Sequence, residues 1–461
     1  MSDRVLAAPD PDSTLRAVRG PRGLWLTSAR RIRSDPTAFA QALRHTHGDI
    51  AYVTALGRDV VIAQGPQAAA ELLGNRDHAF VSEPVYRFAL GRIFERGLLL
   101  MDGDTHHRHR RLMQHAFTGR QLSGYAERLH PLVESAVGRF PVGPGVDVRV
   151  PLKAISLDVA LEIFVGERLS RADADRVNAA FVDLIEAAGA VIRLRLPFTR
   201  WGRATKAKRV VDELFAELVP RRRRQPGSDL MSALCTAEPD EGERLTDAEI
   251  VDHMRFMLFA AHDTATVAMT AMIYQLGRHP QWRERVRAES AALGAYPGLS
   301  ELRSATALDA VFRESMRLRP PVPVIARAAH KDTALCGRFI PQGAFVVTLT
   351  GANHRLADVW PDPDRFDPSR FIDPAGRRDS PRMAWMPFGG GAHACIGMHF
   401  AYLEAATVIH HLVRARDWTV PTDDFERNDA ALVDNHGCLA DVYPIADQFS
   451  QTARAPESPI R

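Results

Sequence analysis

The most constraining feature of this sequence is a glycine-rich loop that leads directly into a helical pattern. The loop contains three consecutive glycines, Gly389 to Gly391, followed shortly by Cys395. Three glycines bring no side chains to a core and lose much chain entropy on folding, so they suit a backbone that presses flat against another group. Residues 400–412 then carry apolar side chains at helical spacing. We therefore expect Cys395 at the beginning of a helix, where free N–H groups and the positive helix end stabilise a thiolate.

Three environments compete as interpretations of Cys395. A buried structural cysteine is the simplest one for any single cysteine. A zinc site would need about four ligands, and Cys-X-X-Cys spacing is absent from the sequence. A lone thiolate in a glycine-rich loop, backed by the ring of Phe388, has what a haem iron needs in a proximal cysteine ligand.

The loop also matches a known pattern, because residues 388–397 follow the order Phe-Gly-X-Gly-X-His-X-Cys-X-Gly. This order resembles, position by position, the haem-binding loop of the cytochrome P450 family. The resemblance runs from about Pro36 to about Pro444. It implies a mainly α protein with a small β portion (α+β), a triangular helix-rich prism with a small antiparallel or mixed sheet. It also implies that haem b is bound with Cys395 as the axial iron ligand, and that the loop contacts the haem through Phe388, Gly389, His393, Cys395 and Gly397.

Bulk composition indicates an ordinary globular chain. The 461 residues carry a formal charge of +3, which is too small to argue for nucleic-acid binding. Four scattered cysteines (Cys235, Cys336, Cys395, Cys438) fit a reducing compartment better than a disulfide framework. There is neither an apolar run of about 18 residues, as a membrane span needs, nor a signal-peptide core. We expect a cytoplasmic monomer without a transmembrane anchor. A flexible arm is expected at 1–20 and a flexible tail at 448–461. Residues 21–447 would form a single domain, with its β-rich part mainly at 45–65 and 325–350.

A dense cationic cluster opens an expected helix at residues 105–111. His106 and Arg110 are four residues apart and share a helix face. Taken alone, such a run is most simply a solvated basic face, and a clamp on ligand carboxylates is the functional alternative. The P450 resemblance carries the second role, the binding of haem propionates, to His106 and Arg110. The resemblance also implies that Arg327 and His393 bind haem propionates, although a histidine lacks a fixed positive charge.

A long helix is expected from about Thr246 to Gly277, opened by a capping-box pattern. Asp263 and Thr264 interrupt its apolar middle; a buried carboxylate is costly there, and a threonine hydroxyl can bond back to the preceding turn. In the family, this position carries Ala-Gly-X-Asp/Glu-Thr above the haem, so the resemblance assigns proton delivery to Asp263 and Thr264. Ala260 would contact the haem and Ala261, which replaces the usual glycine, would line the substrate pocket. His262 falls at the variable position and is left without a role.

A Glu-X-X-Arg pair, Glu314 and Arg317, lies on one face of an expected helix that ends at Pro320. Taken alone it is a trivial surface pair. In the family this pair is buried behind the haem and joined by a further arginine. The counterpart here is Arg370, preceded by Ser369 where a glutamate is common, so we expect a structural triad of Glu314, Arg317 and Arg370 that fixes the thiolate loop.

The remaining segments have local signals. Residues 50–54 and 60–63 predict a hairpin, and helical spacing dominates 67–73, 123–139, 152–165, 172–188 and 206–218. Arg221 to Arg224 are interpreted as a solvated loop, and segments 345–349 and 418–420 as strands of one small sheet. Residues 190–198 match the family's lid over the substrate entrance. Apolar pocket residues are expected at Val322, Val324 and Ile325.

Together these features predict a monooxygenase that inserts one atom of O2 into a C–H bond of a lipophilic molecule, such as a terpenoid, steroid or other polycyclic secondary metabolite. Electrons would come from a separate ferredoxin and an NAD(P)H-dependent ferredoxin reductase. Two alternatives stay open: a peroxygenase or isomerase of the same fold, and a non-catalytic haem protein that binds a ligand. Dependence of the activity on NAD(P)H and a reductase would distinguish the monooxygenase from the peroxygenase or isomerase. Absence of turnover would indicate the non-catalytic ligand-binding protein.

Overall fold

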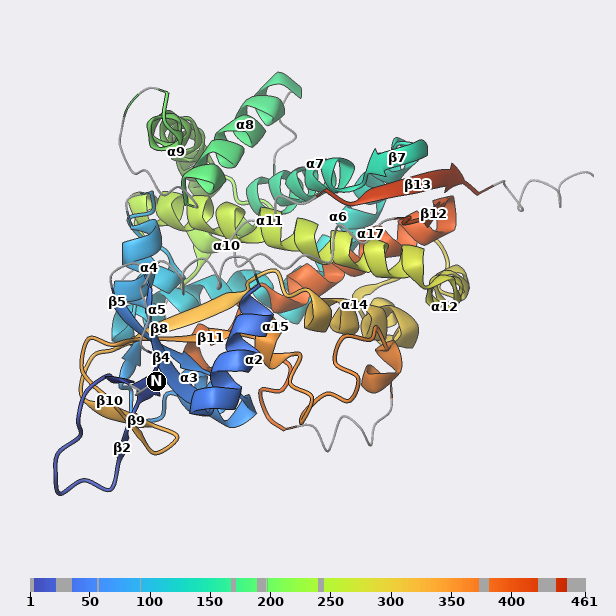
Figure 1. Ribbon diagram of the computed structural model, residues 1–461. Coiled ribbons are helices and arrows are strands. Elements are labelled where there is room, and N and C mark those ends of the chain that lie inside the picture. Colours follow the sequence, from blue (N-terminus) through green and yellow to red (C-terminus); the bar gives the residue numbers. More distant parts are fainter. Residues whose placement is uncertain are drawn as a thin grey trace, which may run out of the picture.

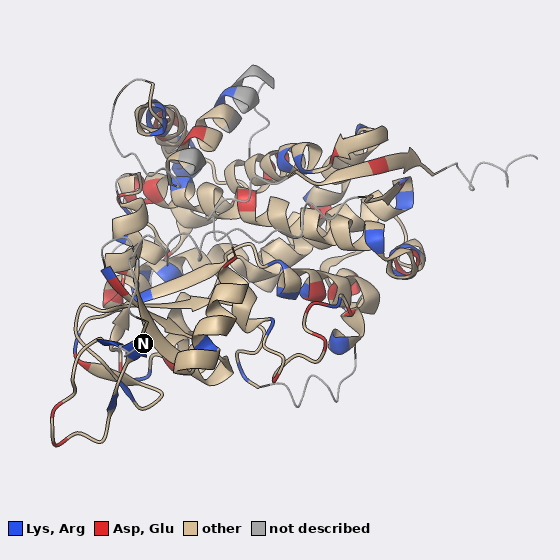
Figure 2. Cartoon of the chain, viewed as in Figure 1, with Lys and Arg blue, Asp and Glu red and all other residues tan. Residues whose placement is uncertain are grey.

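The computed structural model describes residues 4–21, 35–55, 58–91, 93–166, 171–188, 196, 198–238, 244–372, 381–421 and 437–445. Most strands gather on one side of the molecule, and most of the long helices lie on the other (Figure 1). Lys, Arg, Asp and Glu are scattered over helices and strands alike (Figure 2), which agrees with the small net charge. The expected tail at 448–461 lies outside the described residues, as does most of the expected lid at 190–198.

The largest sheet has the strand order β1-β3-β4-β5-β11-β8-β6. The expected hairpin forms its middle, with β4 antiparallel to β5. β5 then pairs in parallel with β11, and β11 pairs antiparallel with β8. The bounds are β1 Arg4–Val5, β3 Arg19–Gly20, β4 Ile50–Ala55, β5 Arg58–Ala63, β6 Phe80–Val81, β8 Val324–Ala329 and β11 Phe345–Leu349.

Helices cover both faces of this sheet. On one face, Ile62 and Leu349 pack against Ala40 and Leu43 of α2 (Pro36–His47). On the other face, Val61, Val346 and Ile325 pack against α3 (Pro66–Gly74). The alternation follows from the strand geometry, in which successive side chains point to opposite faces.

The expectation of a loose arm at residues 1–20 is corrected by the structure. β1 pairs with β3, β3 pairs in parallel with β4, and β2 (Arg16–Ala17) pairs with β10 (Arg338–Ile340). Val18 is completely buried between these strands. The polar, proline-containing sequence concealed this because each strand is only two residues long and gains its order from the sheet beside it.

Two smaller sheets have the orders β2-β10-β9 and β12-β13-β7. Their further strands are β7 Gly143–Asp147, β9 Thr333–Leu335, β12 Arg416–Thr419 and β13 Leu439–Pro444. The two strands expected at 345–349 and 418–420 therefore exist, but they belong to different sheets. Local sequence shows that a segment is extended, and pairing is decided by residues far along the chain.

The helical part contains a long α11 (Asp247–Arg278) at its centre. Thr246 caps it, and Glu249 completes the expected capping box. An 18-residue stretch of α11 is long and apolar enough to cross a membrane by composition alone, but 67% of that stretch is buried inside the protein, as in the core helix of a globular fold. Among the described residues, the other α-helices are α4 Glu83–Leu90, α5 Gly103–Gln114, α6 Gly119–Gly138, α7 Arg149–Ala160, α8 Arg171–Ala188, α9 Arg200–Arg224, α10 Leu230–Thr236, α12 Pro280–Ala292, α13 Leu299–Ser304, α14 Thr306–Leu318, α15 Thr350–Asn353 and α17 Met398–Ala415.

The arginine block at 221–224 is the last turn of α9 and is not a solvated loop. Arg222 donates to the carbonyl oxygens of Val165 and Gly166, and Arg223 donates to that of Cys235 at 3.1 Å. Arginine side chains near a helix C-terminus satisfy carbonyl groups and favour the negative end of the helix dipole. The run of like charges was misleading because Arg222 and Arg223 donate to backbone carbonyl groups of other segments, while Arg221 pairs with Glu217.

Candidate active site

The thiolate loop is a tight turn that ends where α17 begins. The Cys395 N–H donates to the Phe388 carbonyl at 2.9 Å, and the Ala394 N–H donates to Gly391 at 3.1 Å. Gly397 is the N-cap residue of α17, so Cys395 lies two residues before the cap. The sequence-based position of the cysteine at a helix start therefore holds.

Two of the three glycines are required by backbone conformation. Gly389 has φ +68° and Gly391 has φ +66°, the left-handed region that favours glycine. A Cβ on Gly391 would also lie 1.8 Å from the Leu73 carbonyl oxygen at the end of α3. The close neighbour of this glycine is thus the α3 backbone, which the sequence did not indicate.

The Cys395 thiol faces an interior space. The side chain is exposed, yet burial within the protein raises the pKa of its thiol, against the lowering effects of the Gly397 N–H and Arg110. A thiol that is both accessible and desolvated lines a hollow inside the molecule and does not lie on its outer surface. Such a thiol is protonated when free, and a metal ion would deprotonate it on binding.

The predicted propionate ligands come together near this thiol. The His106 and His393 rings lie 4.0 Å apart, although they are 287 positions apart in the sequence. Burial, with the charges of His393 and Arg110, lowers the pKa of His106 to about 3. Burial also lowers the pKa of Arg110, which the nearby Cys395 partly offsets, and that of Arg327. The structure therefore gathers four nitrogen-bearing side chains into one desolvated rim.

This rim has unused hydrogen-bonding capacity. His106 Nε2 and His393 Nδ1 are buried and have no partner. Within the described part of the chain, neither Arg110 nor Arg327 forms an ion pair. Buried polar atoms without a partner and cations without a counter-charge are costly, and the carboxylates of a haem would satisfy them. The rim and the accessible thiol together fit a haem, which Cys395 would hold through the iron.

Asp102 is a site residue that sequence reasoning missed. Its carboxylate accepts from His393 Nε2 at 3.0 Å and from the backbone N–H groups of Ser82 and Glu83. Burial would raise the pKa of Asp102, but these bonds outweigh it and lower the pKa. A lone aspartate before a basic run has no distinctive spacing, so only the fold shows that it orients His393.

The middle of α11 has accessible positions. Ala260 is exposed and Ala261, Asp263 and Thr264 are partly exposed, whereas most residues before and after them are buried. Accessible positions in the middle of a core helix indicate a hollow beside it. Thr264 Oγ1 donates to the Ala260 carbonyl at 2.8 Å, the local bond expected from the sequence.

The two predicted proton-delivery residues have different surroundings. Asp263 Oδ1 forms an ion pair with Lys153 Nζ of α7 at 3.0 Å, and its Oδ2 is buried without a partner. His262, left without a role by the sequence, is completely buried and lies outside the hollow. Burial lowers the pKa of His262 to about 4.

The Glu-X-X-Arg pair is fully buried behind the loop. Arg317 donates to both oxygens of Glu314, at 2.7 and 2.9 Å, and Arg370 Nε lies 3.4 Å from Glu314 Oε1. Arg317 also donates to three carbonyl groups, those of His354, Pro363 and Arg365. The structure thus brings together all three residues of the expected triad.

His354 connects this triad with the thiolate loop and was not anticipated. The Met386 N–H donates to His354 Nε2 at 2.9 Å, and His354 Nδ1 lies 3.1 Å from the Arg317 carbonyl. Burial and the Arg317 charge lower the pKa of His354 to about 3, so the ring is neutral. A neutral ring with its proton on Nδ1 satisfies both contacts at once.

The predicted pocket residues divide between two faces of β8. Val324 is partly exposed on the face that carries α2, whereas Ile325 is buried on the other face beside Gly389 and Met386. Val322 is partly exposed just before the strand. Ile325 therefore supports the thiolate loop and does not share the face of Val324, because neighbouring strand residues alternate.

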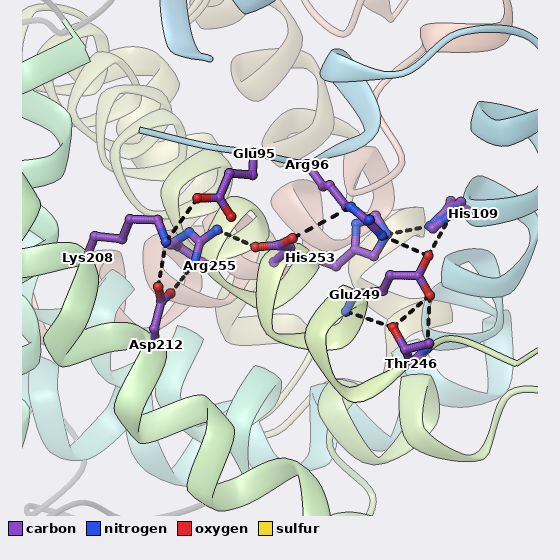
Figure 3. A network of polar contacts seen from close by, with 10 residues as sticks. Glu95, Arg96, His109, Lys208, Asp212, Thr246, Glu249, His253 and Arg255 are labelled. Carbon is purple, nitrogen blue, oxygen red and sulfur yellow. Dashed lines mark hydrogen bonds and ion pairs between the residues drawn. The ribbon is translucent and has the colours of Figure 1, made fainter. Parts of the chain in front are cut away.

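A polar network ties α11 to α9 and α5 (Figure 3). Glu249 binds Arg96 at 3.0 Å, and His109 Nδ1 lies 2.7 Å from His253 Nε2. At the other end, Arg255 contacts Asp212 of α9. This network joins the helix that carries His106 to the helix that carries Thr264, and the partners are too far apart in sequence to be inferred from it.

A cysteine at a helix start, with nitrogen-bearing side chains gathered near it, is the arrangement expected of a haem-thiolate protein. The comparisons with known proteins agree. Residues 19–436 match the family model "Cytochrome P450". The chain therefore belongs to the cytochrome P450 family, whose cofactor is haem, and is a monooxygenase oxidoreductase.

Individual relatives agree with the family assignment. The chain is 37% identical over 437 residues to cytochrome P450 136 of Mycobacterium tuberculosis, covering 92% of this chain and 87% of that protein. It is 30% identical over 423 residues to abscisic acid 8'-hydroxylase 3 of Oryza sativa subsp. japonica, covering 89% and 82%. Among solved structures, it is similar to "Retinoic acid bound cyanobacterial CYP120A1", with a TM-score of 0.81, 26% identity and coverage of 92% and 99%.

Proposed function

We propose that this protein hydroxylates a lipophilic carboxylic acid of isoprenoid or similar polyene type. The observation that carries the monooxygenase reaction is the pairing of an accessible, desolvated Cys395 with Asp263 and Thr264 on the accessible stretch of α11. Support for the substrate class comes from the names of two similar proteins, abscisic acid 8'-hydroxylase and retinoic acid bound CYP120A1. Each name contains such an acid.

The haem supplies oxygen activation when it is bound. Cys395 would be its axial ligand, and a thiolate in that position favours cleavage of the O–O bond. His106, Arg110, Arg327 and His393 would hold the carboxylates at its edge. Ala260, Phe388, Gly389 and Gly397 would lie against it, with Glu314, Arg317 and Arg370 fixing the loop from behind.

Proton delivery is assigned to the chain itself. Thr264 Oγ1 would hold a proton in the hollow and pass it on, and Asp263 would resupply it through its partnerless Oδ2. The ion pair with Lys153 ties Asp263 to α7. Ala261, Val322 and Val324 would contact the substrate, whose apolar body suits their side chains.

Electrons would come from a separate ferredoxin and its NAD(P)H-dependent reductase, and the monomer would work in the cytoplasm. An acidic ferredoxin would be attracted by the basic residues of α5, Arg108 and Arg111. A reduction rate that falls as ionic strength rises supports this docking mode, and a rate independent of salt contradicts it.

The decisive assay is turnover of retinoic acid and abscisic acid by the purified protein with O2, NAD(P)H, a ferredoxin and its reductase. We expect a product that is larger by one oxygen atom, with the label of ¹⁸O2. Product formed from hydrogen peroxide alone at the same rate would favour a peroxygenase. Tight binding without any product would favour a ligand-binding protein.

A further inference from the structure

Asp102 stands at the N-cap position of α5, yet its side chain serves other groups. An aspartate in that position usually accepts a hydrogen bond from a backbone N–H of the first turn of its own helix. Among the described residues, Asp102 has no such bond. Its carboxylate accepts instead from the backbone N–H groups of Ser82, at 2.9 Å, and Glu83, at 2.7 Å, and from His393 Nε2 at 3.0 Å. One carboxylate therefore joins the start of α4 to the cationic rim.

A second contact holds α4 to the same rim. Tyr86, in the middle of α4, has its hydroxyl 3.5 Å from the Ala326 backbone nitrogen of β8. The next residue of β8 is Arg327. Burial lowers the pKa of Arg327, whereas Tyr86 and Asp102 act to raise it, Tyr86 also through a side-chain hydrogen bond. Because α4 and β8 lie side by side (Figure 1), both attachments of α4 end on residues of the rim.

The chain that follows α4 reaches the accessible stretch of α11. The Phe94 N–H donates to the carbonyl of Leu90, the last residue of α4, at 3.0 Å, which ties Phe94 to the end of the helix. The Phe94 ring centroid lies 4.6 Å from that of Phe259 in α11. Phe259 is partly exposed and directly precedes the exposed Ala260. A displacement of α4 would therefore move an aromatic side chain that packs beside this accessible stretch.

We propose that Asp102 is a positioning residue that couples the haem-binding rim to α4 and to Phe94. The carboxylates of a bound haem would hold His393 and Arg327, and these two residues hold α4 through Asp102 and Tyr86. A coupling free energy acts in both directions. A correctly placed α4 therefore also strengthens the hold of the rim on the haem.

The test compares the protein loaded with haem and the protein loaded with haem dimethyl ester, in which both carboxylates are esterified. Hydrogen exchange of the backbone amides is measured for residues 82–90 and 93–100. In the wild type, we expect both segments to exchange about tenfold faster in the ester form, as for the loss of hydrogen bonds to a charged group. In Asp102→Asn, exchange should be fast with either cofactor, because the connection is already broken.

Asp104→Asn is the matched control, since Asp104 is an exposed acid in the first turn of the same helix. This variant should keep the wild-type difference between the two cofactors. Asp102→Glu retains a carboxylate and should restore part of the difference. If Asp102 supported only the local fold, Asp102→Asn would raise exchange but would leave the difference between the cofactors intact.

A second measurement needs only the natural haem. Because the coupling is reciprocal, Asp102→Asn should hold haem less tightly and transfer it to excess apomyoglobin about tenfold faster than the wild type. Asp104→Asn should transfer haem at the wild-type rate. Equal rates for Asp102→Asn and the wild type would overturn the coupling.

The exchange data can overturn it in two further ways. Equal exchange of the wild type with haem and with its dimethyl ester would do so, as would a cofactor difference that survives in Asp102→Asn. A response confined to residues 82–90 would overturn the extension to Phe94. Neither measurement involves a substrate or turnover, so each of these outcomes leaves the proposed function intact.

Discussion

Thr264 combines a local backbone bond with access to the hollow. Its hydroxyl donates to the Ala260 carbonyl at 2.8 Å, and Ala261 O lies 3.3 Å away. A hydroxyl in this position loosens the helix turn on its own side and offers an oxygen to a proton chain. The side chain is small, so its removal should disturb chemistry far more than folding.

Thr264→Ala should therefore keep the haem and the fold but lose coupling. We expect NAD(P)H consumption to continue while product falls about tenfold or more, with the missing electrons recovered as hydrogen peroxide, because proton delivery by a positioned group is worth about 10²–10⁴-fold. Thr264→Ser, which restores the hydroxyl, serves as the control. Full coupling in the alanine variant would contradict the relay.

Among single residues, those in spaced motifs were predictable from sequence. The order of Phe388, His393 and Cys395 was enough to place all three in one loop, and the structure brings His106 beside His393. Asp102 and His354 were not predictable, because each acts through contacts with distant backbone or with a single side chain, and neither has a characteristic spacing.

Between elements, the contact of α17 with α7 contains an unexpected buried acid. Glu404 is 2% exposed, and burial raises its pKa to about 8, although a side-chain hydrogen bond with Ser156 acts to lower it. Its Oε1 has no partner. Glu404 is therefore protonated in the folded protein at neutral pH, whereas it ionises near 4.5 when exposed on unfolding.

This difference makes stability fall as pH rises from about 5 to 8, since unfolding then releases the proton. The contribution of protonated Glu404 to the free energy of unfolding is fully present below the pKa of the unfolded chain. It is lost once the pH passes the pKa in the folded protein. Glu404→Gln, which mimics the neutral acid, should be more stable than the wild type at pH 8 by a few kcal/mol and should flatten the pH dependence. The check is the free energy of unfolding at pH 5, 6.5 and 8; parallel curves for both proteins would contradict a raised pKa.

The contact between α14 and the thiolate loop depends on a buried ion pair. Glu314 and Arg317 have no exposed side-chain surface. Glu314→Gln should destabilise the protein by about 3 kcal/mol or more, because it leaves Arg317 buried without its counter-charge. Glu83→Gln breaks the exposed pair with Arg87 and should cost under about 1 kcal/mol. Equal denaturation midpoints for the two variants would contradict a structural role of the triad.

Most helices and the main hairpin followed from periodicity, because their apolar side chains recur at the spacing of the element. The arginine block misled because α9 continues through Pro220 to Arg224, where carbonyl groups of other segments receive the guanidinium groups. Pro220 would be expected to end the helix. The helix continues because distant carbonyl groups accept hydrogen bonds from the arginines, and local composition does not show these acceptors.

For the chain as a unit, the sequence predicted the balance of helix and strand but not the topology of the sheets. Strands β1, β2 and β3 join sheets whose other members lie farther along the chain, some beyond residue 320. Such pairings depend on closure of long loops, which local propensity does not encode. The thiolate loop, the cationic rim and the accessible middle of α11 come from widely separated stretches, and only the assembled fold brings them around one hollow.

The central claim is that sulfur from Cys395 would be the iron ligand of a bound haem. The measurement is the absorption spectrum of the reduced protein with carbon monoxide, recorded for the wild type and for Cys395→Ala. We predict that the wild type shows the long-wavelength Soret band of a thiolate-ligated haem and that the variant lacks it. A wild-type band at the position of a histidine-ligated haem, or purified protein that takes up no porphyrin, would contradict the account.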